Sequence, residues 1–151
     1  MKAIIVIGNV CAGKSEFVAQ LSKKLATYKI IQIDDYHREH SHSKEAWKHL
    51  IVDALNFKKL IIECSGASKY YEKLLFRLKE KKANVLVVKI ETPKSVCFNR
   101  FNHRPRNNTH LEKIFDGWGT INFIDEKLKK IPSNIELDGT GNPFIEFKKL
   151  L

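Results

Sequence analysis

The stretch Gly8-Asn9-Val10-Cys11-Ala12-Gly13-Lys14-Ser15 guides the interpretation of the whole sequence. The segment before it, residues 2–7, is a nearly continuous apolar run, which is typical of a buried strand in a parallel sheet. After it, apolar residues recur at helical spacing from Phe17 to Leu25, and neither Gly nor Pro interrupts them. The sequence therefore predicts a strand, a glycine-containing turn and a helix in direct succession.

The same eight residues match the pattern G-x-x-x-x-G-K-[ST], which predicts a phosphate-binding loop. Gly8 and Gly13 permit backbone conformations and close approaches that a side chain would prevent. Backbone N–H groups of the loop and of the following helix start can then converge on a phosphate. Lys14 is expected to reach the β- and γ-phosphates, and the Ser15 hydroxyl to ligate Mg²⁺. The predicted nucleotide-binding residues here are Gly8, Asn9, Val10, Cys11, Ala12, Gly13, Lys14 and Ser15.

The length of 151 residues is that of one ordinary domain. The longest apolar runs have the length of strands, which argues against a membrane span, and the first strand begins without a signal-peptide pattern. Cys11, Cys64 and Cys97 lack the spacing of a zinc site. We therefore expect a reduced, cytoplasmic protein without a membrane partner.

The chain is basic, with a formal net charge of +10 from 27 Lys and Arg against 17 Asp and Glu. Most of these cations are Lys scattered along the sequence, which is typical of a solvated surface. Anionic partners, either nucleotides or nucleic acid, are the alternative explanation. The few Arg are more informative, because Arg100, Arg104 and Arg106 lie within seven residues.

Apolar runs of strand length alternate with segments of helical periodicity along the chain. This alternation predicts one three-layer α/β domain over residues 1–151, with a parallel sheet and a ligand site at the carboxyl ends of its strands. Residues 142–151 are not assigned to an element. After residues 2–7, the predicted strands are 29–33, 59–63, 84–90 and 133–137, and the predicted helices cover 14–26, 47–55, 71–78, 93–102 and 121–131.

Local signals mark several boundaries in the second half of the chain. Thr92 followed by Pro93 predicts a helix N-cap with Pro in the first helical position. Thr109 with Glu112 resembles a capping box. The glycines of residues 117–119 are expected to interrupt helical structure before the next helix begins.

Acidic residues follow two of the predicted strands. Asp34 and Asp35 end the second strand, and Glu63 ends the third. A kinase benefits from a carboxylate that accepts the proton of the attacking hydroxyl, so Asp34 is the candidate general base and Asp35 the neighbouring alternative. Glu63 is expected to hold Mg²⁺ or its waters and to border the acceptor site. A helix cap, a turn residue or a carboxylate bonded to loop N–H groups remains the structural alternative.

The arginines suggest a small lid over residues 100–109. Arg100 and Arg104 have planar, multidentate donors that can stabilise the charge of a transferring phosphoryl group. The segment is polar and contains Pro105, as a lid closing over phosphates would be. The alternative is that these Arg are ordinary surface charges.

The segment after Asp35 is rich in His, with His37, His40 and His42. Their spacing matches no common zinc pattern, and Mg²⁺ prefers oxygen ligands. We therefore expect a solvated loop on the acceptor side of the site. Arg38 in this loop is a candidate to hold a phosphate of the acceptor.

Together these motifs resemble the P-loop kinase superfamily, and within it the small hydroxyl kinases. Asp34-Asp35-Tyr36 is similar to the Asp-Asp-Tyr of phage-type polynucleotide 5′-kinases, in which the first Asp is the general base. Phosphoribulokinases and nicotinamide riboside kinases carry similar Asp-Asp-aromatic pairs. In the polynucleotide kinases an Arg follows directly, whereas here His37 precedes Arg38. We expect no appended phosphatase or ligase domain.

The resemblance extends to the second half of the chain. The spacing Thr92-Pro93…Arg100…Arg104 is similar to the lid helix of polynucleotide kinases, where the Arg equivalent to Arg104 contacts the transferring phosphate. The segment Leu137-Asp138-Gly139-Thr140 resembles the turn beside the adenine, which implies that Gly139 and Thr140 bind the nucleotide. The resemblance implies a P-loop NTPase fold of the nucleoside- and nucleotide-kinase type and ATP-dependent phosphoryl transfer.

The acceptor remains open at this stage. The first candidate is a hydroxyl of a nucleoside-like or other small metabolite, and the second is the 5′-hydroxyl of a polynucleotide. A nucleoside monophosphate is third, because an acceptor phosphate needs no general base. A regulatory NTP-binding protein without an acceptor is the alternative from another class, although the chain lacks the guanine-specifying motif Asn-Lys-x-Asp.

Overall fold

The fold was analysed in a computed structural model that describes residues 1–104 and 117–150. Its centre is a five-stranded, all-parallel sheet with the strand order β2-β3-β1-β4-β5. The first two strands along the chain are therefore separated by the third, which leaves the end of β1 flanked by neighbours on both sides. The strands are β1 (Lys2–Gly8), β2 (Lys29–Gln32), β3 (Lys59–Glu63), β4 (Asn84–Glu91) and β5 (Ile135–Asp138).

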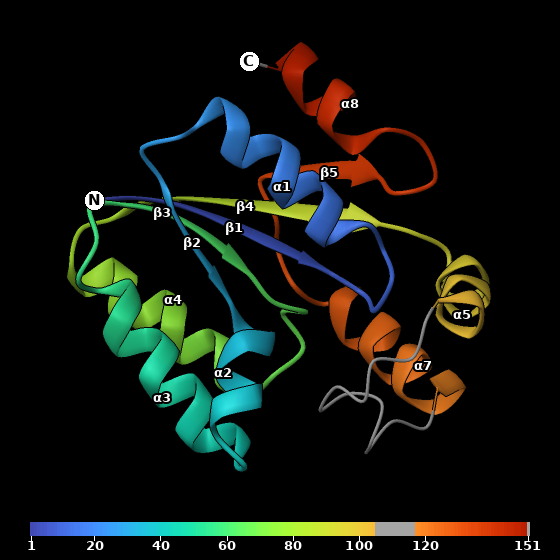
Figure 1. The fold of residues 1–151 in the computed structure, drawn as a ribbon, viewed down its shortest axis with the longest axis horizontal. Coiled ribbons are helices and arrows are strands. Elements are labelled where there is room, and N and C mark those ends of the chain that lie inside the picture. The colour runs from blue at the N-terminus through green and yellow to red at the C-terminus, as the bar shows by residue number, and fades with distance from the viewer. Residues whose placement is uncertain (105–116, 151) are drawn as a thin grey trace.

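Helices cover both faces of the sheet, which gives the predicted three layers. Figure 1 shows α1 and α8 on one face and α3, α4 and α7 on the other. The Phe17 ring of α1 meets the Phe147 ring of α8 edge to face at 5.5 Å, which anchors the C-terminal helix. The described helices are α1 (Lys14–Lys24), α2 (Ile33–Glu39), α3 (Ser43–Ala54), α4 (Tyr71–Glu80), α5 (Lys94–His103), α7 (Gly117–Leu128) and α8 (Pro143–Leu150).

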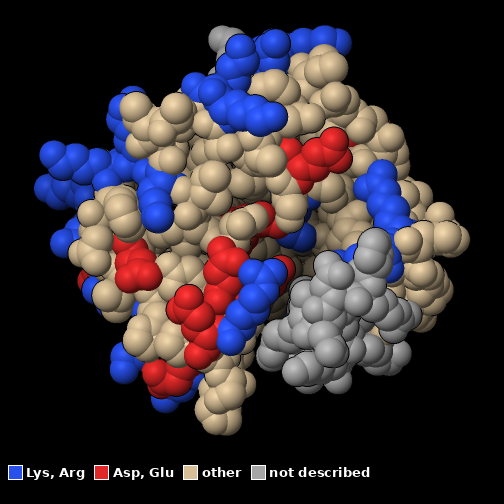
Figure 2. Space-filling view, viewed as in Figure 1, with Lys and Arg blue, Asp and Glu red and all other residues tan. Residues whose placement is uncertain are grey.

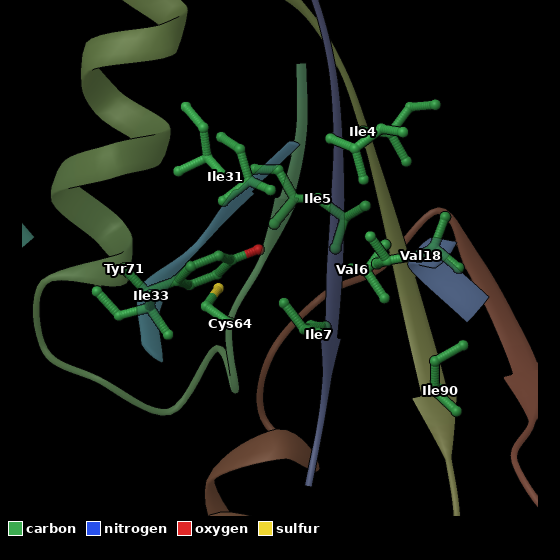
Figure 3. Packing of buried hydrophobic residues seen from close by; sticks show 14 of the residues in the cluster. Ile4, Ile5, Val6, Ile7, Val18, Ile31, Ile33, Cys64, Tyr71 and Ile90 are labelled. Carbon is green, nitrogen blue, oxygen red and sulfur yellow. The ribbon is translucent and has the colours of Figure 1, made fainter. Parts of the chain in front are cut away.

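The core follows from the apolar runs of the central strands. Ile5 and Ile7 of β1 and Ile61 and Ile62 of β3 are fully buried, as expected for strands covered on both faces. Figure 3 shows β1 side chains among those of the neighbouring strands and helices, with Tyr71 of α4 beside Cys64. This packing fixes the position of the end of β1, where the glycine-containing loop begins.

The structure corrects the prediction of a polar loop after Asp34 and Asp35. The second strand ends at Gln32, and Ile33–Glu39 form the helix α2. Two acidic residues in the first turn favour a helix because their negative charges interact favourably with the positive N-terminal end of the helix dipole. The Tyr36 hydroxyl also donates a 2.7 Å hydrogen bond to Asp53 Oδ2 of α3, so tertiary packing supports this short helix.

The predicted cap at Thr92 is also wrong. Thr92 Oγ1 donates a 2.9 Å hydrogen bond to the carbonyl of Ala12 in the loop after β1, so it is not available to the helix. Pro93 is the N-cap of α5 instead, and helical structure begins at Lys94. The proposed capping box of Thr109 and Glu112, and Arg106, lie outside the described residues.

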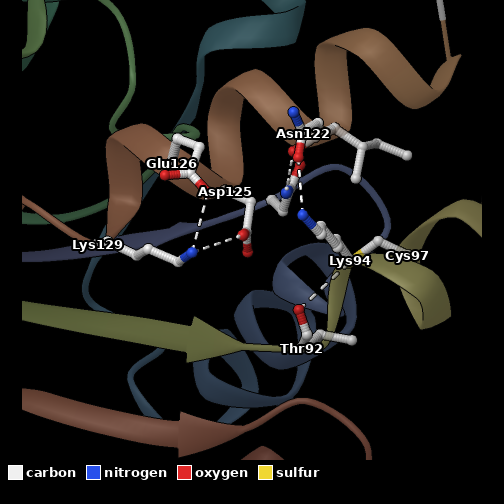
Figure 4. A network of polar contacts seen from close by, with 9 residues as sticks. Thr92, Lys94, Cys97, Asn122, Asp125, Glu126 and Lys129 are labelled. Carbon is white, nitrogen blue, oxygen red and sulfur yellow. Dashed lines mark hydrogen bonds and ion pairs between the residues drawn. The ribbon is translucent and has the colours of Figure 1, made fainter.

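The expected interruption at residues 117–119 is a further correction, because α7 already begins at Gly117. A Cβ on Gly117 would lie 3.1 Å from the Phe101 ring, so this glycine permits α5 and α7 to pack closely. Lys94 of α5 donates a 2.8 Å hydrogen bond to Asn122 of α7, as Figure 4 shows. Contacts between distant segments therefore stabilise a helix that local propensity disfavours.

The C-terminal segment, residues 142–151, was not assigned to an element from the sequence, and Pro143–Leu150 of it form the helix α8. No helix in the described part of the chain is both long enough and apolar enough to cross a membrane.

Candidate functional site

A cleft of about 680 Å³ opens at the carboxyl ends of the strands, as predicted for a parallel α/β sheet. One side is formed by the loop after β1, α5 and the turn between β5 and α8. The other side is formed by α2, the first turns of α3 and the segment after β3. The cleft thus joins a half with phosphate-binding features to a half that carries acidic and hydroxyl side chains.

The loop after β1 has the backbone that its sequence requires. Gly13 has a φ of +104°, a conformation that side-chain-bearing residues rarely adopt. Gly8 is needed for a different reason, because a Cβ there would lie 2.9 Å from the carbonyl oxygen of Ile90 in β4. Cys11 is also left-handed, with a φ of +58°. Residues 10–15 all line the cleft.

The Lys14 ammonium group lies over this loop. Its Nζ donates hydrogen bonds of 2.9 Å to the carbonyl of Gly8 and 2.6 Å to that of Asn9. These bonds satisfy a cation that would otherwise be unpaired, and they keep it beside the loop N–H groups. A phosphate bound in the loop would exchange these neutral partners for a charged one.

Ser15, Glu63 and Gln32 form a hydrogen-bonded chain across three elements. Ser15 Oγ donates a 2.7 Å bond to Glu63 Oε1, and Gln32 Nε2 donates a 2.5 Å bond to Glu63 Oε2. Glu63 is buried, with 7% of its surface exposed, and the pairing of β2 with β3 places Gln32 beside it. Each oxygen of this carboxylate therefore has a fixed partner, and the group borders the cleft.

The three acceptor-side candidates lie together on α2. Asp34, Asp35 and Arg38 all line the cleft. Arg38 forms a 2.6 Å ion pair with Asp35, and both side chains are 56% exposed. A solvated pair of this kind is weak, so Arg38 can exchange Asp35 for another anion at small cost. Asp34 is exposed to solvent in the first turn of the helix.

Arg100 and Arg104 reach the loop from α5. Arg100 donates to the carbonyls of Cys11 at 3.1 Å and of Gly139 at 2.9 Å, which joins the loop to the turn after β5. Arg104 lies within 3.6 Å of Cys11 Sγ, and its guanidinium is 4.9 Å from the centre of the Phe101 ring. Both arginines line the cleft, so the half of the cleft that is formed by the loop carries three cations together with Lys14.

Three predicted nucleotide-binding residues are not among the described residues that line the cleft. Gly8 ends β1, and Asn9 is buried, where its Nδ2 donates a 2.8 Å bond to the carbonyl of Ile121 in α7. Thr140 donates through its N–H and hydroxyl to Asp138, which lowers the pKa of that carboxyl group. Gly139, by contrast, lines the cleft.

Sequence reasoning did not identify several cleft residues. Gln32, Trp47, Ser65 and Ser68 line the half of the cleft that carries the acidic side chains, together with His37, whose segment was expected on that side. Gln32 was detectable in principle, because a polar residue at the carboxyl end of an apolar strand points to a site. Trp47 was assigned to an apolar helix face, and it is indeed 2% exposed. Trp47 forms part of the cleft wall because of the way α3 packs, which the sequence pattern does not show.

The thiol of Cys64 also borders the cleft but is protected from ionisation. Burial raises its pKa to about 12, against an ordinary value of 9.0. The His-rich segment gives no metal centre either, because the described residues contain no cluster of three or more His, Cys, Asp or Glu suited to a metal ion. The His40 ring instead stacks on His49 of α3, with centroids 4.2 Å apart.

Comparison with known proteins gives no relative by sequence: no family model matches the chain, and no curated protein is significantly similar. Many solved structures share the fold. A putative kinase from Chloroflexus aurantiacus has a TM-score of 0.74 at 14% identity, with 99% of this chain and 95% of that chain covered. Shikimate kinase from Bacteroides thetaiotaomicron has a TM-score of 0.67 at 16% identity, with coverage of 98% and 97%.

A third similar structure is YorR from Bacillus subtilis, solved in complex with phosphorylated GDP. Its TM-score is 0.63 at 23% identity, and 97% of this chain and 91% of that chain are covered. These likenesses extend over nearly the whole chain. The protein therefore has the α/β fold of the small P-loop kinases.

Proposed function

We propose that the protein is an ATP- and Mg²⁺-dependent kinase that transfers the γ-phosphoryl group to an acceptor hydroxyl. One observation carries the proposal: the phosphate-binding loop, the Ser15–Glu63 pair and Asp34 all border a single cleft. Loop N–H groups and Lys14 supply the donors for the β- and γ-phosphates, and the opposite wall offers a carboxylate.

The residues at Ser15 and Glu63 fit Mg²⁺. A hydroxyl and a carboxylate are hard oxygen donors of the kind this ion prefers, and they already lie 2.7 Å apart. Ser15 would hold the ion directly, and Glu63 would hold it or one of its waters. When bound, Mg²⁺ supplies neutralisation of the charge on the phosphate oxygens.

Asp34 is the proposed general base. Its carboxylate accepts the proton of the acceptor hydroxyl while that oxygen forms a bond to the γ-phosphorus. The bond from the γ-phosphorus to the bridging oxygen breaks, and ADP leaves with the electron pair. Lys14, Arg100 and Arg104 stabilise the charge that develops on the phosphoryl oxygens, and such cations act strongly where water is excluded.

The acceptor that we favour is a hydroxyl of a nucleoside-like or other small metabolite. The acceptor half combines the buried Trp47 with the hydroxyls of Ser43, Ser65 and Ser68, which suits a compact polar ligand with one flat face. The likeness to YorR, solved with a phosphorylated nucleotide, is consistent with this class.

A polynucleotide 5′-hydroxyl is the second candidate. It is favoured by the sequence Asp34-Asp35-Tyr36 and by the exposed position of Arg38, which is able to bind a phosphate of a strand entering the cleft. The net charge of +10 points in the same direction.

Phosphoryl transfer from γ-labelled ATP tests both candidates. The panel contains nucleosides, nucleoside monophosphates, small polyols and a 5′-hydroxyl oligonucleotide, each with Mg²⁺ and with an EDTA control. Label on a small acceptor supports the first candidate, and label on the oligonucleotide alone supports the second. ATP binding without transfer to any member would contradict the assignment as a hydroxyl kinase of these classes.

A further inference from the structure

The edge of the sheet opposite the cleft is lined with lysines. Lys29 begins β2, Lys59 begins β3 with Lys58 directly before it, Lys2 begins β1, and Lys81 and Lys82 precede β4. We call these six residues the lysine row. All six are exposed, and the four chain segments that contain them, residues 1–2, 25–29, 55–59 and 81–84, include no Asp or Glu.

The positive charge of the lysine row is not compensated within the described chain. Across residues 1–104 and 117–150, none of the six lysines takes part in an ion pair. Lys2 is the direct register partner of Lys59, so two like charges lie side by side on neighbouring strands. Such pairs are destabilising. Helix capping accounts for Lys81, which is the C-cap of α4, but not for the lysines of β1, β2 and β3, which lie in strands or in the loops before them.

The strand order turns these residues into a continuous row. Neighbouring strands lie about 4.8 Å apart, so the row from β2 through β3 and β1 to β4 spans about 14 Å. Figure 2 shows Lys and Arg gathered at the side of the molecule where Figure 1 shows the strands beginning. The row is separated from the cleft by the length of β1, about 20 Å for its seven residues.

Aromatic rings accompany the cations at one end of the row. Lys29 Nζ lies 5.7 Å from the centre of the Phe57 ring, and Lys59 Nζ lies 6.0 Å from that of the Tyr28 ring. Phe57 and Ile30 are each 37% exposed. Rings of this kind stack with bases, while lysines bind the phosphates beside them.

We propose that the lysine row is a binding surface for single-stranded nucleic acid, separate from the catalytic cleft. The phosphate backbone follows the lysines across the starts of the strands, and bases stack on Phe57 and Tyr28. The combination of charge with the exposed Phe57 ring and the half-buried Tyr28 ring favours a single strand over a duplex, whose bases are already stacked. This surface does not depend on the identity of the acceptor in the cleft.

Fluorescence anisotropy with a labelled single strand of about 20 nucleotides, phosphorylated at both ends so that it cannot accept phosphate, tests the proposal. We expect the affinity to fall as the salt concentration rises. The double variant Lys58→Glu/Lys59→Glu should reduce the slope of log K against log salt by about 1.4, because each lost phosphate contact accounts for about 0.7. A saturating, non-hydrolysable ATP analogue should leave the binding unchanged.

The matched control is Lys148→Glu/Lys149→Glu, an exposed consecutive pair on α8 whose first member also lies near a ring, that of Phe144. It changes the net charge equally, and we expect it to keep the wild-type slope. Phe57→Leu keeps an apolar side chain and should weaken binding of the single strand about fivefold, without a change in the slope of log K against log salt. Kinase activity should survive all three changes, so a failure of this proposal can be distinguished from a failure of the proposed kinase function.

Three results would overturn the proposal. Equal losses in both double variants would indicate a general effect of charge, and wild-type binding by Lys58→Glu/Lys59→Glu would remove the row from the interaction. Binding of phosphatidylserine vesicles in a parallel assay, with no binding of the oligonucleotide, would identify a membrane surface instead.

Discussion

The Asp34 carboxylate borders the cleft from the first turn of α2, opposite the phosphate-binding loop. Asp34→Asn keeps the shape of the side chain but removes its ability to accept a proton. We expect kcat to fall by about 10²–10⁴-fold, with nucleotide affinity unchanged. Steady-state kinetics and calorimetry with ADP measure the two quantities.

The neighbouring variant Asp35→Asn is the control for this experiment, because Asp35 is engaged by Arg38. It should retain most of the turnover. If Asp34→Asn turns over like the wild type, Asp34 is not the base.

Gln32 affects the proposed Mg²⁺ site through Glu63. Gln32→Leu has a similar volume but no N–H donor for Glu63 Oε2, so the carboxylate loses one of its two fixed partners. Loss of such a supporting partner costs about 10–100-fold in metal affinity. We expect this loss when Mg²⁺ is titrated into the protein–ADP complex by calorimetry, with ADP affinity in EDTA unaffected.

Glu63→Gln is the reference variant for the Mg²⁺ titration, and it should lose at least as much affinity. An unchanged Mg²⁺ titration in Gln32→Leu, with a clear loss in Glu63→Gln, would limit Gln32 to a structural role. No loss in either variant would contradict the metal site itself.

The Tyr71 hydroxyl is buried without a hydrogen-bond partner in the described part of the chain. Burying such a group carries a desolvation cost of about 1–3 kcal/mol. Tyr71→Phe should therefore leave the free energy of unfolding in urea equal to the wild-type value or above it.

Tyr36→Phe provides the contrast to Tyr71→Phe. The Tyr36 hydroxyl is bonded to Asp53, and burial together with this bond raises the pKa of the phenol. Its removal should lower the free energy of unfolding by about 1–2 kcal/mol. A clear loss of stability in Tyr71→Phe would indicate that its hydroxyl has a partner in solution.

At the scale of elements, the turn between β5 and α8 packs closely against the phosphate-binding loop. A Cβ on Gly139 would collide with Thr92 Oγ1 and lie 2.5 Å from the carbonyl oxygen of Ala12. Gly139→Ala should therefore push the turn and the loop apart, with a loss of about 1–3 kcal/mol in stability and weaker ADP binding.

Gly141→Ala tests the same turn without the collision, because no heavy atom lies within 4 Å of the added Cβ. It should melt like the wild type and bind ADP normally. Equal behaviour of the two variants would show that the contact between turn and loop is not needed for nucleotide binding.

At the scale of the whole molecule, buried thiols make stability depend on alkaline pH. Burial raises the pKa of Cys64 to about 12 and that of Cys97 to about 11. In the unfolded chain both thiols lose their protons near 9.0, so above that pH the unfolded state binds fewer protons than the folded one. The free energy of unfolding therefore falls as pH rises through this window and is fully retained below it.

Urea denaturation from about pH 8 to about pH 10 measures this slope. Cys64→Ala and Cys97→Ala should each make it shallower, because each removes one of the two thiols. A wild-type stability that rises over this range would contradict the assignment.

The whole molecule places the cleft and the lysine row at opposite ends of the strands of the sheet. The cleft lies at the carboxyl ends of the strands, and the lysine row lies at their starts. In the sequence these lysines are scattered singly or in pairs over more than half of the chain. Only the strand order brings them into one row, which is why composition alone did not distinguish a binding surface from a solvated one.

The sequence by itself determined the fold class, the sheet strands to within one or two residues, and the glycine-containing loop. These features depend on apolar runs and motif spacing that lie within short segments, so they are visible before folding. Asp34, Glu63 and Arg100 line one cleft, because parallel strands end at the same side of a sheet.

The tertiary structure alone decided the contacts between segments. Asp34 and Asp35 lie in a helix because α2 packs on α3, and Thr92 bonds the loop instead of capping α5 because β4 lies beside β1. Gln32 meets Glu63 only through the pairing of β2 with β3. Such contacts join residues tens of positions apart, and their energies depend on distances that local patterns do not contain.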